Sequence, residues 1–126
     1  MSRRSDRGAA AVELALVLPV LLTLVLGIVD FGFAFNAKIA ITQAAQEGAR
    51  LASVQKDATQ GEVSSRVNTA LTNGGQVLGV TTTLVSSCAA TNPTTATVQV
   101  SGSSPTILPI PDISVTARGV MQCTER

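Results

Sequence analysis

Residues 8–29 read GAAAVELALVLPVLLTLVLGIV, an apolar run interrupted by a single charged residue, Glu13. The stretch from Leu14 to Val29 carries no charge at all. Together with Ala9–Val12, it approaches the roughly 20 apolar residues that a helix needs to span a lipid bilayer. We therefore expect a transmembrane helix here, with the segments before and after it on opposite sides of the membrane.

Basic residues lie on one side of this run, at Arg3, Arg4 and Arg7. Because flanks rich in Lys and Arg stay in the cytoplasm, we expect a single-pass cell membrane protein with a cytoplasmic N-terminus and an extracytoplasmic C-terminal head. The competing interpretation is a secretory signal peptide cleaved near Asn36. Ordinary signal peptidase needs small residues in an A-x-A-like pattern, whereas the run is followed by DFGFAF at residues 30–35.

The composition excludes several classes of function. The 126 residues include nine Lys and Arg against eight Asp and Glu, and the net charge of +1 gives no electrostatic case for nucleic acid. There is no His and there are only two Cys, which argues against a His/Cys metal site and against a His-dependent catalytic triad. Phosphate-binding and nucleophile motifs are also missing from the sequence. We therefore predict no enzymatic activity, no metal, no cofactor and no small-molecule substrate.

The helical pattern continues beyond the apolar run, over residues 36–54. Small or apolar residues recur there at three- and four-residue steps: Ala37, Ile41, Ala44, Ala45, Gly48 and Ala52. Small residues let helices approach closely, so this stripe could contact neighbouring chains, or it could pack on the protein's own head. Glu47 and Arg50 lie towards other faces, with the i,i+3 spacing of an ion pair. A helix from Ala9 to about Lys56 would be about 70 Å long.

Two residues inside the expected helix have consequences of their own. Pro19 lacks an N–H and its ring clashes with the carbonyl of Ala15, so a kink is expected. Asp30 follows the apolar run and should lie near the outer membrane interface, where a charge is tolerated. We favour an interfacial Asp30 that reaches water or pairs with Lys38 over a buried functional carboxylate.

A small head follows the helix. Residues 56–61 form a break, and residues 62–71 predict a short helix because Val63, Val67 and Leu71 make a one-sided apolar stripe. The sequence Asn-Gly-Gly at residues 73–75 should end it.

The remainder of the head is rich in Val and Thr and predicts an antiparallel sheet of about three strands. The strands are expected at Val77–Ser86, Ala96–Ser101 and Ser114–Cys123. Thr91–Thr94 should form a turn, and the Pro-rich segment Ser101–Asp112 an extended loop or edge segment. A core of this size without large aromatics is close to the point at which a domain needs a staple or a partner.

Cys88 and Cys123 fall in this extracytoplasmic head, so one disulfide is the simplest prediction. A loop of this size would contribute about 3–4 kcal/mol on the chain-entropy model, which is large for so thin a core. The alternative is a redox-active pair, but the sequence has neither a C-x-x-C motif nor a His to support one.

Glu13 is an ionisable residue within an apolar helix. A carboxylate near a helix N-terminus is favoured by the helix dipole and by the unsatisfied N–H groups. In lipid such a group is costly and usually paired, and the free α-amine of a neighbouring subunit would be a natural partner. From position alone, an interfacial Glu13 that caps the helix and reaches water is an equally good interpretation.

Gly8 and Glu13 repeat a known arrangement, in which a short basic leader ends in Gly and a Glu follows five residues later in an apolar run. This resembles the cleavage site of type IV prepilins, which a membrane aspartyl peptidase cuts after the Gly. The resemblance implies processing between Gly8 and Ala9, and it favours the subunit-pairing interpretation of Glu13.

A wider resemblance covers about 45 residues, which are similar to the N-terminal module of TadE-like proteins, pseudopilins of the tight-adherence (Flp) pilus machinery. The matching features are Gly8, Val12-Glu13, Leu18-Pro19, Gly27, Asp30-Phe31-Gly32 and Gln46-Glu47-Gly48-Ala49-Arg50. Leu14 departs from the pattern, because the family more often has an aromatic residue directly after the Glu. The departure also argues against the major Flp pilin, which is much shorter as a family.

The resemblance implies a TadE-like minor pilin or pseudopilin that takes part in assembling a pilus used for surface adhesion. Its partners would be the membrane, a prepilin peptidase, and other pilin or pseudopilin subunits and pilus assembly proteins. The expected fold class is α+β and pilin-like, with a leader (1–8), a transmembrane or filament helix (9–35), its extracytoplasmic continuation (36–56) and the head (57–126). The alternative function is an anchored extracytoplasmic binding or structural module that never enters a filament.

Overall fold

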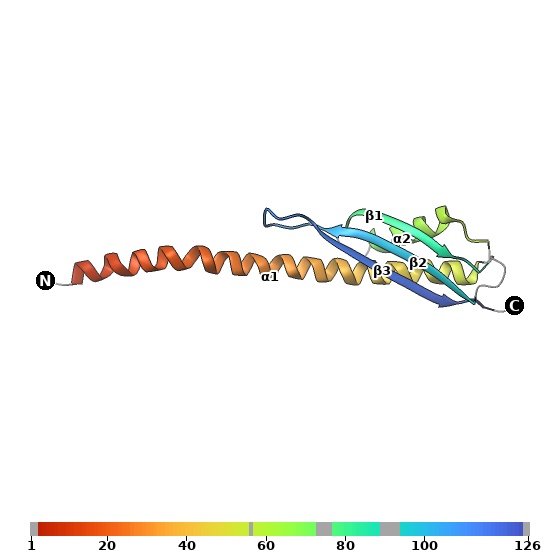
Figure 1. Cartoon of the computed structure of the whole chain (residues 1–126), viewed down its shortest axis with the longest axis horizontal. Coiled ribbons are helices and arrows are strands. Elements are labelled where there is room, and N and C mark those ends of the chain that lie inside the picture. Colours follow the sequence, from red (N-terminus) through yellow and green to blue (C-terminus); the bar gives the residue numbers. More distant parts are fainter. Residues whose placement is uncertain (1–2, 56, 73–76, 89–93, 125–126) are drawn as a thin grey trace.

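The computed structural model of the chain describes residues 3–55, 57–72, 77–88 and 94–124, with side chains from residue 8 onward. Over these residues, five elements follow one another: α1 (Arg3–Val54), α2 (Gln60–Thr72), β1 (Leu78–Ser86), β2 (Thr95–Ser104) and β3 (Ile113–Gln122). Figure 1 shows that α1 extends far beyond the other elements, which gather around its C-terminal half. The predicted α+β layout of a long helix, a short helix and a three-stranded antiparallel sheet is confirmed.

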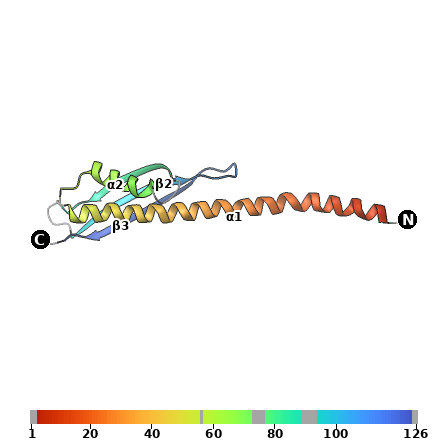
Figure 2. The same cartoon turned by 180° about the vertical axis from the view of Figure 1, so that it is seen from behind.

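The long helix α1 has 52 residues and is therefore about 78 Å long. Ala and Leu, which are strong helix formers, dominate its sequence. The helix is continuous through Pro19, and the hydroxyl of Thr23 donates to the Pro19 carbonyl at 2.8 Å. Figures 1 and 2 show a gentle curve in the N-terminal half. A local kink at Pro19 stays a prediction, and the proline does not interrupt the helix.

A reciprocal cap fixes the start of α2. The Glu62 N–H donates to the Thr59 hydroxyl at 3.3 Å, and the Thr59 N–H donates to the Glu62 carboxylate at 2.9 Å. In this capping box, Thr and Glu three positions apart satisfy each other's free N–H groups. The helix consequently begins at Gln60, slightly before the expected Glu62. The expected terminator at residues 73–75 lies outside the described residues.

The sheet is a simple antiparallel meander with β2 in the centre. Val98 pairs with Gly119 and Val100 with Ala117, and β2 and β3 run opposite each other as far as Ser104 and Ile113. The Pro-rich connection is therefore shorter than predicted, because Ser101–Ser104 belong to β2 and the loop covers only residues 105–112. Most of the turn expected at Thr91–Thr94 lies outside the described residues.

The core lies between one face of the sheet and the two helices. Figures 1 and 2 show both helices on the same side of the sheet, and α1 contacts α2, β2 and β3. Alternate residues of β2 and β3 point into this core, as the period of two in a half-buried strand requires. The fully buried residues of α1, α2 and β2 include Ile41, Ala44, Ala45, Ala49, Val63, Val67, Val98 and Val100.

The small-residue stripe of α1 allows unusually close packing. Ala37, Ala44 and Ala52 are all buried by the chain's own head. A Cβ added at Gly48 would come within 2.9 Å of the Val67 side chain and 3.3 Å of Val98. Of the two uses considered for this stripe, the structure therefore shows packing on the protein's own head.

Candidate functional site

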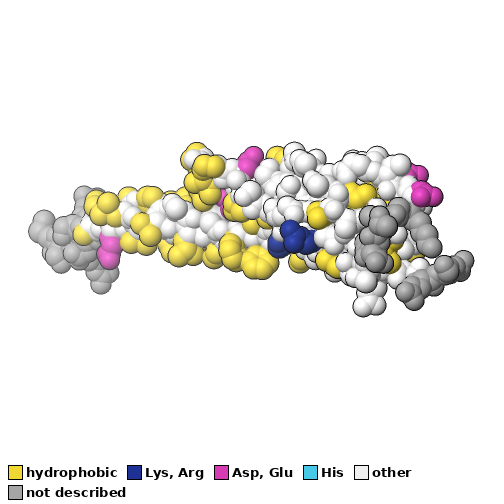
Figure 3. Space-filling model, turned by 45° about the vertical axis from the view of Figure 1, so that its right-hand side comes forward, with side chains coloured by type: hydrophobic (Ala, Val, Ile, Leu, Met, Phe, Trp, Pro, Cys, Tyr) yellow, Lys and Arg dark blue, Asp and Glu magenta, His cyan; other side chains and the backbone are white. Residues whose placement is uncertain are grey.

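The N-terminal half of α1 differs from the rest because no described element covers it. Large apolar side chains are exposed on all its faces, among them Val12, Leu14, Leu16, Val20, Leu22, Val25, Ile28 and Phe31. Figure 3 shows this apolar surface continuing to the edge of the head. The most apolar 18-residue window of the helix has no buried share, and its length and composition are sufficient to cross a membrane. The helix is thus consistent with single-pass membrane anchoring.

The residues of the expected processing site lie at the far end of this uncovered segment. Gly8, Ala9 and Glu13 are all within α1 and all exposed. Within the described part of the chain, the Glu13 carboxylate has no hydrogen-bond or ion-pair partner. The head lies at the other end of α1 (Figure 1), so Glu13 is available to groups outside the chain.

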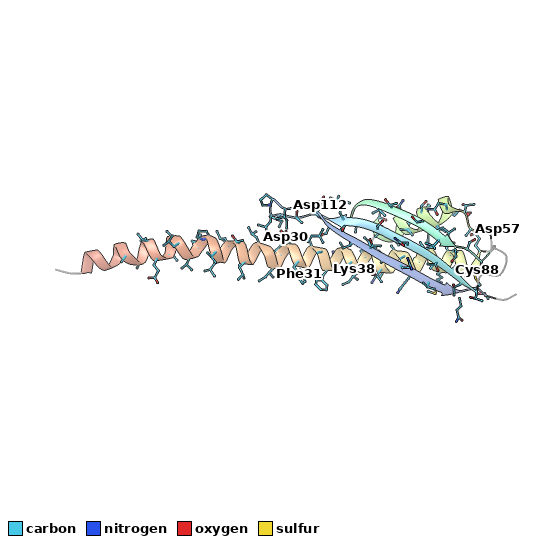
Figure 4. All side chains as sticks on the ribbon, in the orientation of Figure 1. Asp30, Phe31, Lys38, Asp57, Cys88 and Asp112 are labelled. Atoms are coloured by element: carbon cyan, nitrogen blue, oxygen red, sulfur yellow. A yellow bond between two sulfur atoms is a disulfide. The ribbon has the colours of Figure 1, made fainter. Side chains whose placement is uncertain are left out.

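Asp30 has a different environment from the one predicted. Its side chain is only 3% exposed, and its two carboxylate oxygens accept the backbone N–H groups of Ile107 at 2.8 Å and Leu108 at 3.1 Å. Figure 4 shows Asp30 facing the loop between β2 and β3, whereas Phe31 lies on the opposite side of the helix. The expectation of a water-exposed Asp30, or of an Asp30–Lys38 pair, was wrong.

One sequence signal could have placed Asp30 correctly. The buried stripe contains Ala37, Ile41 and Ala44, and Asp30 precedes Ala37 by seven residues, which is two helical turns. Extending the stripe towards the N-terminus therefore puts Asp30 on the head-facing side. The sequence alone does not show which backbone groups would meet it there.

The Gln46–Arg50 motif has a packing role. Gly48 and Ala49 are buried beneath the sheet and α2. Glu47 forms an ion pair with Arg66 of α2 at 3.2 Å, in place of the expected partner Arg50. The motif thus seats α2 on α1.

Polar side chains connect the helices to both edge strands. The Lys38 ammonium donates to the carbonyl of Thr116 on β3. At the other edge, the Gln60 amide donates to the Thr82 carbonyl at 2.6 Å and accepts the Leu84 N–H at 2.7 Å. Gln60 thereby pairs with β1 as a neighbouring strand would, which occupies part of an otherwise free edge. Neither role was evident from the sequence.

The two cysteines form the expected disulfide. Cys88 and Cys123 are bonded, and the link closes a loop with a sequence separation of 35. It joins the chain just after β1 to the end of β3, at the head's distal end (Figure 4). The Cys123 N–H also donates to the Thr94 carbonyl at 2.9 Å, which ties the start of β2 to the same point.

Clusters of metal ligands and surface grooves are the other kinds of site that the described side chains could form. No cluster of three or more His, Cys, Asp and Glu residues that could hold a metal ion is found among them. A shallow groove of about 300 Å³ lies between α1 and α2, lined by Glu47, Arg50, Leu51, Val54 and Arg66. Of its three charged residues, Glu47 and Arg66 already pair with each other. The distinctive surface of the described residues is therefore the uncovered half of α1.

Comparison with known proteins agrees with this emphasis on α1. Residues 8–50 match the family described as TadE-like protein. No curated protein and no solved structure matches the chain. The match begins at Gly8 and ends at Arg50. It therefore includes the apolar half of α1 that no other element covers, and most of the small-residue stripe on which the head packs. The resemblance seen in the N-terminal sequence is confirmed over this segment, where the chain is similar to TadE-like proteins.

Proposed function

We propose that the protein is a minor pilin or pseudopilin of a tight-adherence (Flp) pilus, which takes part in assembling a pilus used for surface adhesion. A prepilin peptidase removes residues 1–8, so the mature chain starts at Ala9. The N-terminus is cytoplasmic and the head extracytoplasmic, and the helix later contacts other pilin or pseudopilin subunits. The observation that carries this proposal is the TadE-like match over residues 8–50, on a helix whose apolar half is left uncovered.

The geometry of α1 supports a segment that changes surroundings. Lipid and the apolar helices of other subunits both suit an apolar surface, and the uncovered half of α1 has exposed apolar side chains on every face. A helix anchored in the bilayer can therefore move into a filament core without changing its exposed residues. Glu13 is the one charged side chain between Gly8 and Val29, and it pairs with the free α-amine of a neighbouring mature chain.

The same structure also favours one feature of the rival function, a permanently anchored extracytoplasmic module. The small-residue stripe above the membrane is occupied by the head, so this stripe is not available for helix contacts between chains. A module that never entered a filament would need no processing at Gly8 and no partner for Glu13.

The first experiment is to determine the N-terminal residue of the protein recovered from its native membrane. A start at Ala9 supports prepilin-type processing. A start at Met1 or Ser2, in cells with an active prepilin peptidase, contradicts the proposal and leaves a plain membrane anchor.

A second experiment separates anchoring from assembly. Glu13→Ala should abolish or strongly reduce pilus assembly while membrane insertion stays normal, because only the pairing between subunits is lost. Val12→Ala is the matched control, since it trims an exposed neighbour without removing a charge. Normal assembly with Glu13→Ala would favour the anchored module instead.

A further inference from the structure

The loop between β2 and β3 presents an apolar tip that the head does not cover. Residues 105–112 read PTILPIPD, with no charged residue before Asp112. Ile107 is 57% exposed and Ile110 48% exposed, and the prolines between and after them are exposed as well. Figure 1 shows this loop turning back along α1, towards the uncovered half of the helix. Adjacent exposed apolar side chains on a small polar head indicate a contact surface.

The tip is held in one place. Both carboxylate oxygens of Asp30 are used by the N–H groups of Ile107 and Leu108. Within the loop, the Ile110 N–H donates to the Leu108 carbonyl at 2.7 Å, and the Thr106 hydroxyl donates to the Ile110 carbonyl at 3.1 Å. The exposed isoleucines are therefore fixed at the level of Asp30 along the helix axis.

That level coincides with the expected outer boundary of the bilayer. A helix that starts at Ala9 rises about 32 Å by Asp30, and the hydrocarbon core of a typical bilayer is about 30 Å thick. Phe31, Phe33 and Phe35 are exposed just beyond this point, so the surface of α1 is still apolar at the level of the loop. The tip of the loop adds further apolar surface at that same level.

We propose that this loop is a second membrane contact, in which Ile107 and Ile110 insert into the outer boundary between lipid headgroups and acyl chains. Asp30 is its positioning residue, because the carboxylate holds the loop against the helix. The recognised chemistry is apolar lipid, since the tip carries no cation that would select an anionic headgroup. The inference rests on the membrane anchoring by α1 proposed above, and it does not depend on entry into a filament.

Lipid fits this surface better than a partner protein because of where the tip lies. It adjoins the one helix surface already assigned to the bilayer, at the depth where that helix emerges. Two contacts, α1 and the loop, would fix the head's orientation relative to the membrane.

The test uses the full chain in lipid vesicles, with an environment-sensitive fluorophore on Ile110→Cys and the native Cys88–Cys123 disulfide intact. Lipids carrying shallow nitroxide quenchers report contact. The matched control is Val85→Cys, which is 55% exposed on β1, away from the loop. Quenching should be several-fold stronger at position 110 than at position 85. Equal quenching at the two positions would overturn the proposal.

The role of Asp30 is tested in the same labelled background. Asp30→Asn replaces one accepting oxygen by an amide nitrogen that cannot accept an N–H, so the loop should loosen and quenching should fall towards the control level. Asp112→Asn changes an exposed carboxylate at the end of the loop and should leave quenching unchanged. Strong quenching that survives Asp30→Asn would overturn the positioning role.

The remaining outcomes separate this inference from the proposed anchoring. If the unmodified chain fails to float with vesicles, membrane anchoring by α1 fails and the loop contact fails with it. If the chain floats but the label at position 110 stays in water, only the loop contact is wrong. Disulfide crosslinks between copies through the unlabelled Ile110→Cys thiols under oxidising conditions, without lipid quenching of the labelled variant, would overturn the proposal and identify another copy of the chain as the occupant.

Discussion

The two halves of α1 belong to one continuous helix and share a largely apolar composition, yet only one of them is covered. In the C-terminal half, the stripe consists of small residues such as Ala37, Ala44 and Ala49, and the sheet lies directly on it. In the N-terminal half, large residues such as Leu16 and Ile28 stay exposed. Side-chain size separates the two environments, because Ala and Gly permit a close backbone approach that Leu and Ile prevent.

The comparison also indicates which solvent each half is built for. Side chains in the head pack closely, so a single added methyl group changes the stability of the head. The uncovered half makes no such contact within the described residues, and its side chains need only an apolar environment. Substitutions at packed positions of the head should therefore change its stability strongly. Substitutions of similar size in the uncovered half of α1 should change the stability of the protein very little.

The largest effect is expected from the disulfide. The double substitution Cys88→Ser with Cys123→Ser should lower the free energy of unfolding of the head by about 3–4 kcal/mol, because the unfolded chain regains the freedom of the closed loop. Amide hydrogen exchange measured in detergent micelles resolves the two regions. Exchange in β2 and β3 should accelerate strongly, whereas exchange in the N-terminal half of α1 should not change.

Chemical reduction of the unmodified chain provides the control for this pair of substitutions. It should reproduce the faster exchange in the sheet. A sheet that exchanges at the same rate with and without the disulfide would show that the helices alone hold the head together.

The next effect concerns a close backbone approach of β3 to α1. A Cβ at Gly119 would collide with the carbonyl carbon and oxygen of Ala45. Both are backbone atoms of α1, so they cannot move away as the end of a flexible side chain could. Gly119→Ala should therefore destabilise the head by about 3 kcal/mol, at the upper end of the usual cost of overpacking. The loss should appear in a denaturant titration of the head.

Gly32→Ala is the matched control in the other half of the helix. An added Cβ there has nothing within 4 Å, and Ala is a better helix former than Gly by about 1 kcal/mol. The helix should be unchanged or slightly more stable. Equal effects at the two glycines would contradict the contrast between a closely packed half and an uncovered half.

These contacts mark the limit of what the sequence could predict. The helix, the short α2 and the three strands follow from local patterns: an apolar run, the spacing of Val63, Val67 and Leu71, and segments rich in Val and Thr. The disulfide followed from the count of two cysteines in a head expected outside the cell. Each of these signals depends on neighbours in sequence or on composition.

The contacts that were missed join residues far apart in the chain. Asp30 meets Ile107, and Glu47 meets Arg66, because the sheet and α2 fold back along α1. For Glu47, the i,i+3 spacing had instead suggested Arg50 as the partner. Side-chain pairs on one helix are worth only about 0.2–0.5 kcal/mol, so tertiary packing readily replaces them.

The smallest effect is expected at the cap of α2, and it depends on pH. The Thr59 N–H, then the Thr59 hydroxyl and the Gln55 amide, donate to the Glu62 carboxylate and lower its pKa below the ordinary value of 4.5. A lowered pKa in the folded state means that the ionised cap contributes stability above the ordinary value. That contribution is lost as the pH falls below 4.5 and through the folded-state pKa.

Denaturant unfolding of the head, followed across this pH range, tests the cap. Glu62→Gln should remove the part of the acid loss that this carboxylate contributes, and the variant should be slightly less stable at neutral pH. Asp57→Asn, on an exposed carboxylate just before the cap, should keep the acid loss of the unmodified chain. Exchange in the uncovered half of α1 should not respond to either change, because no described contact links that half to α2. An identical acid response in Glu62→Gln and the unmodified chain would show that the cap does not depend on the charge of Glu62.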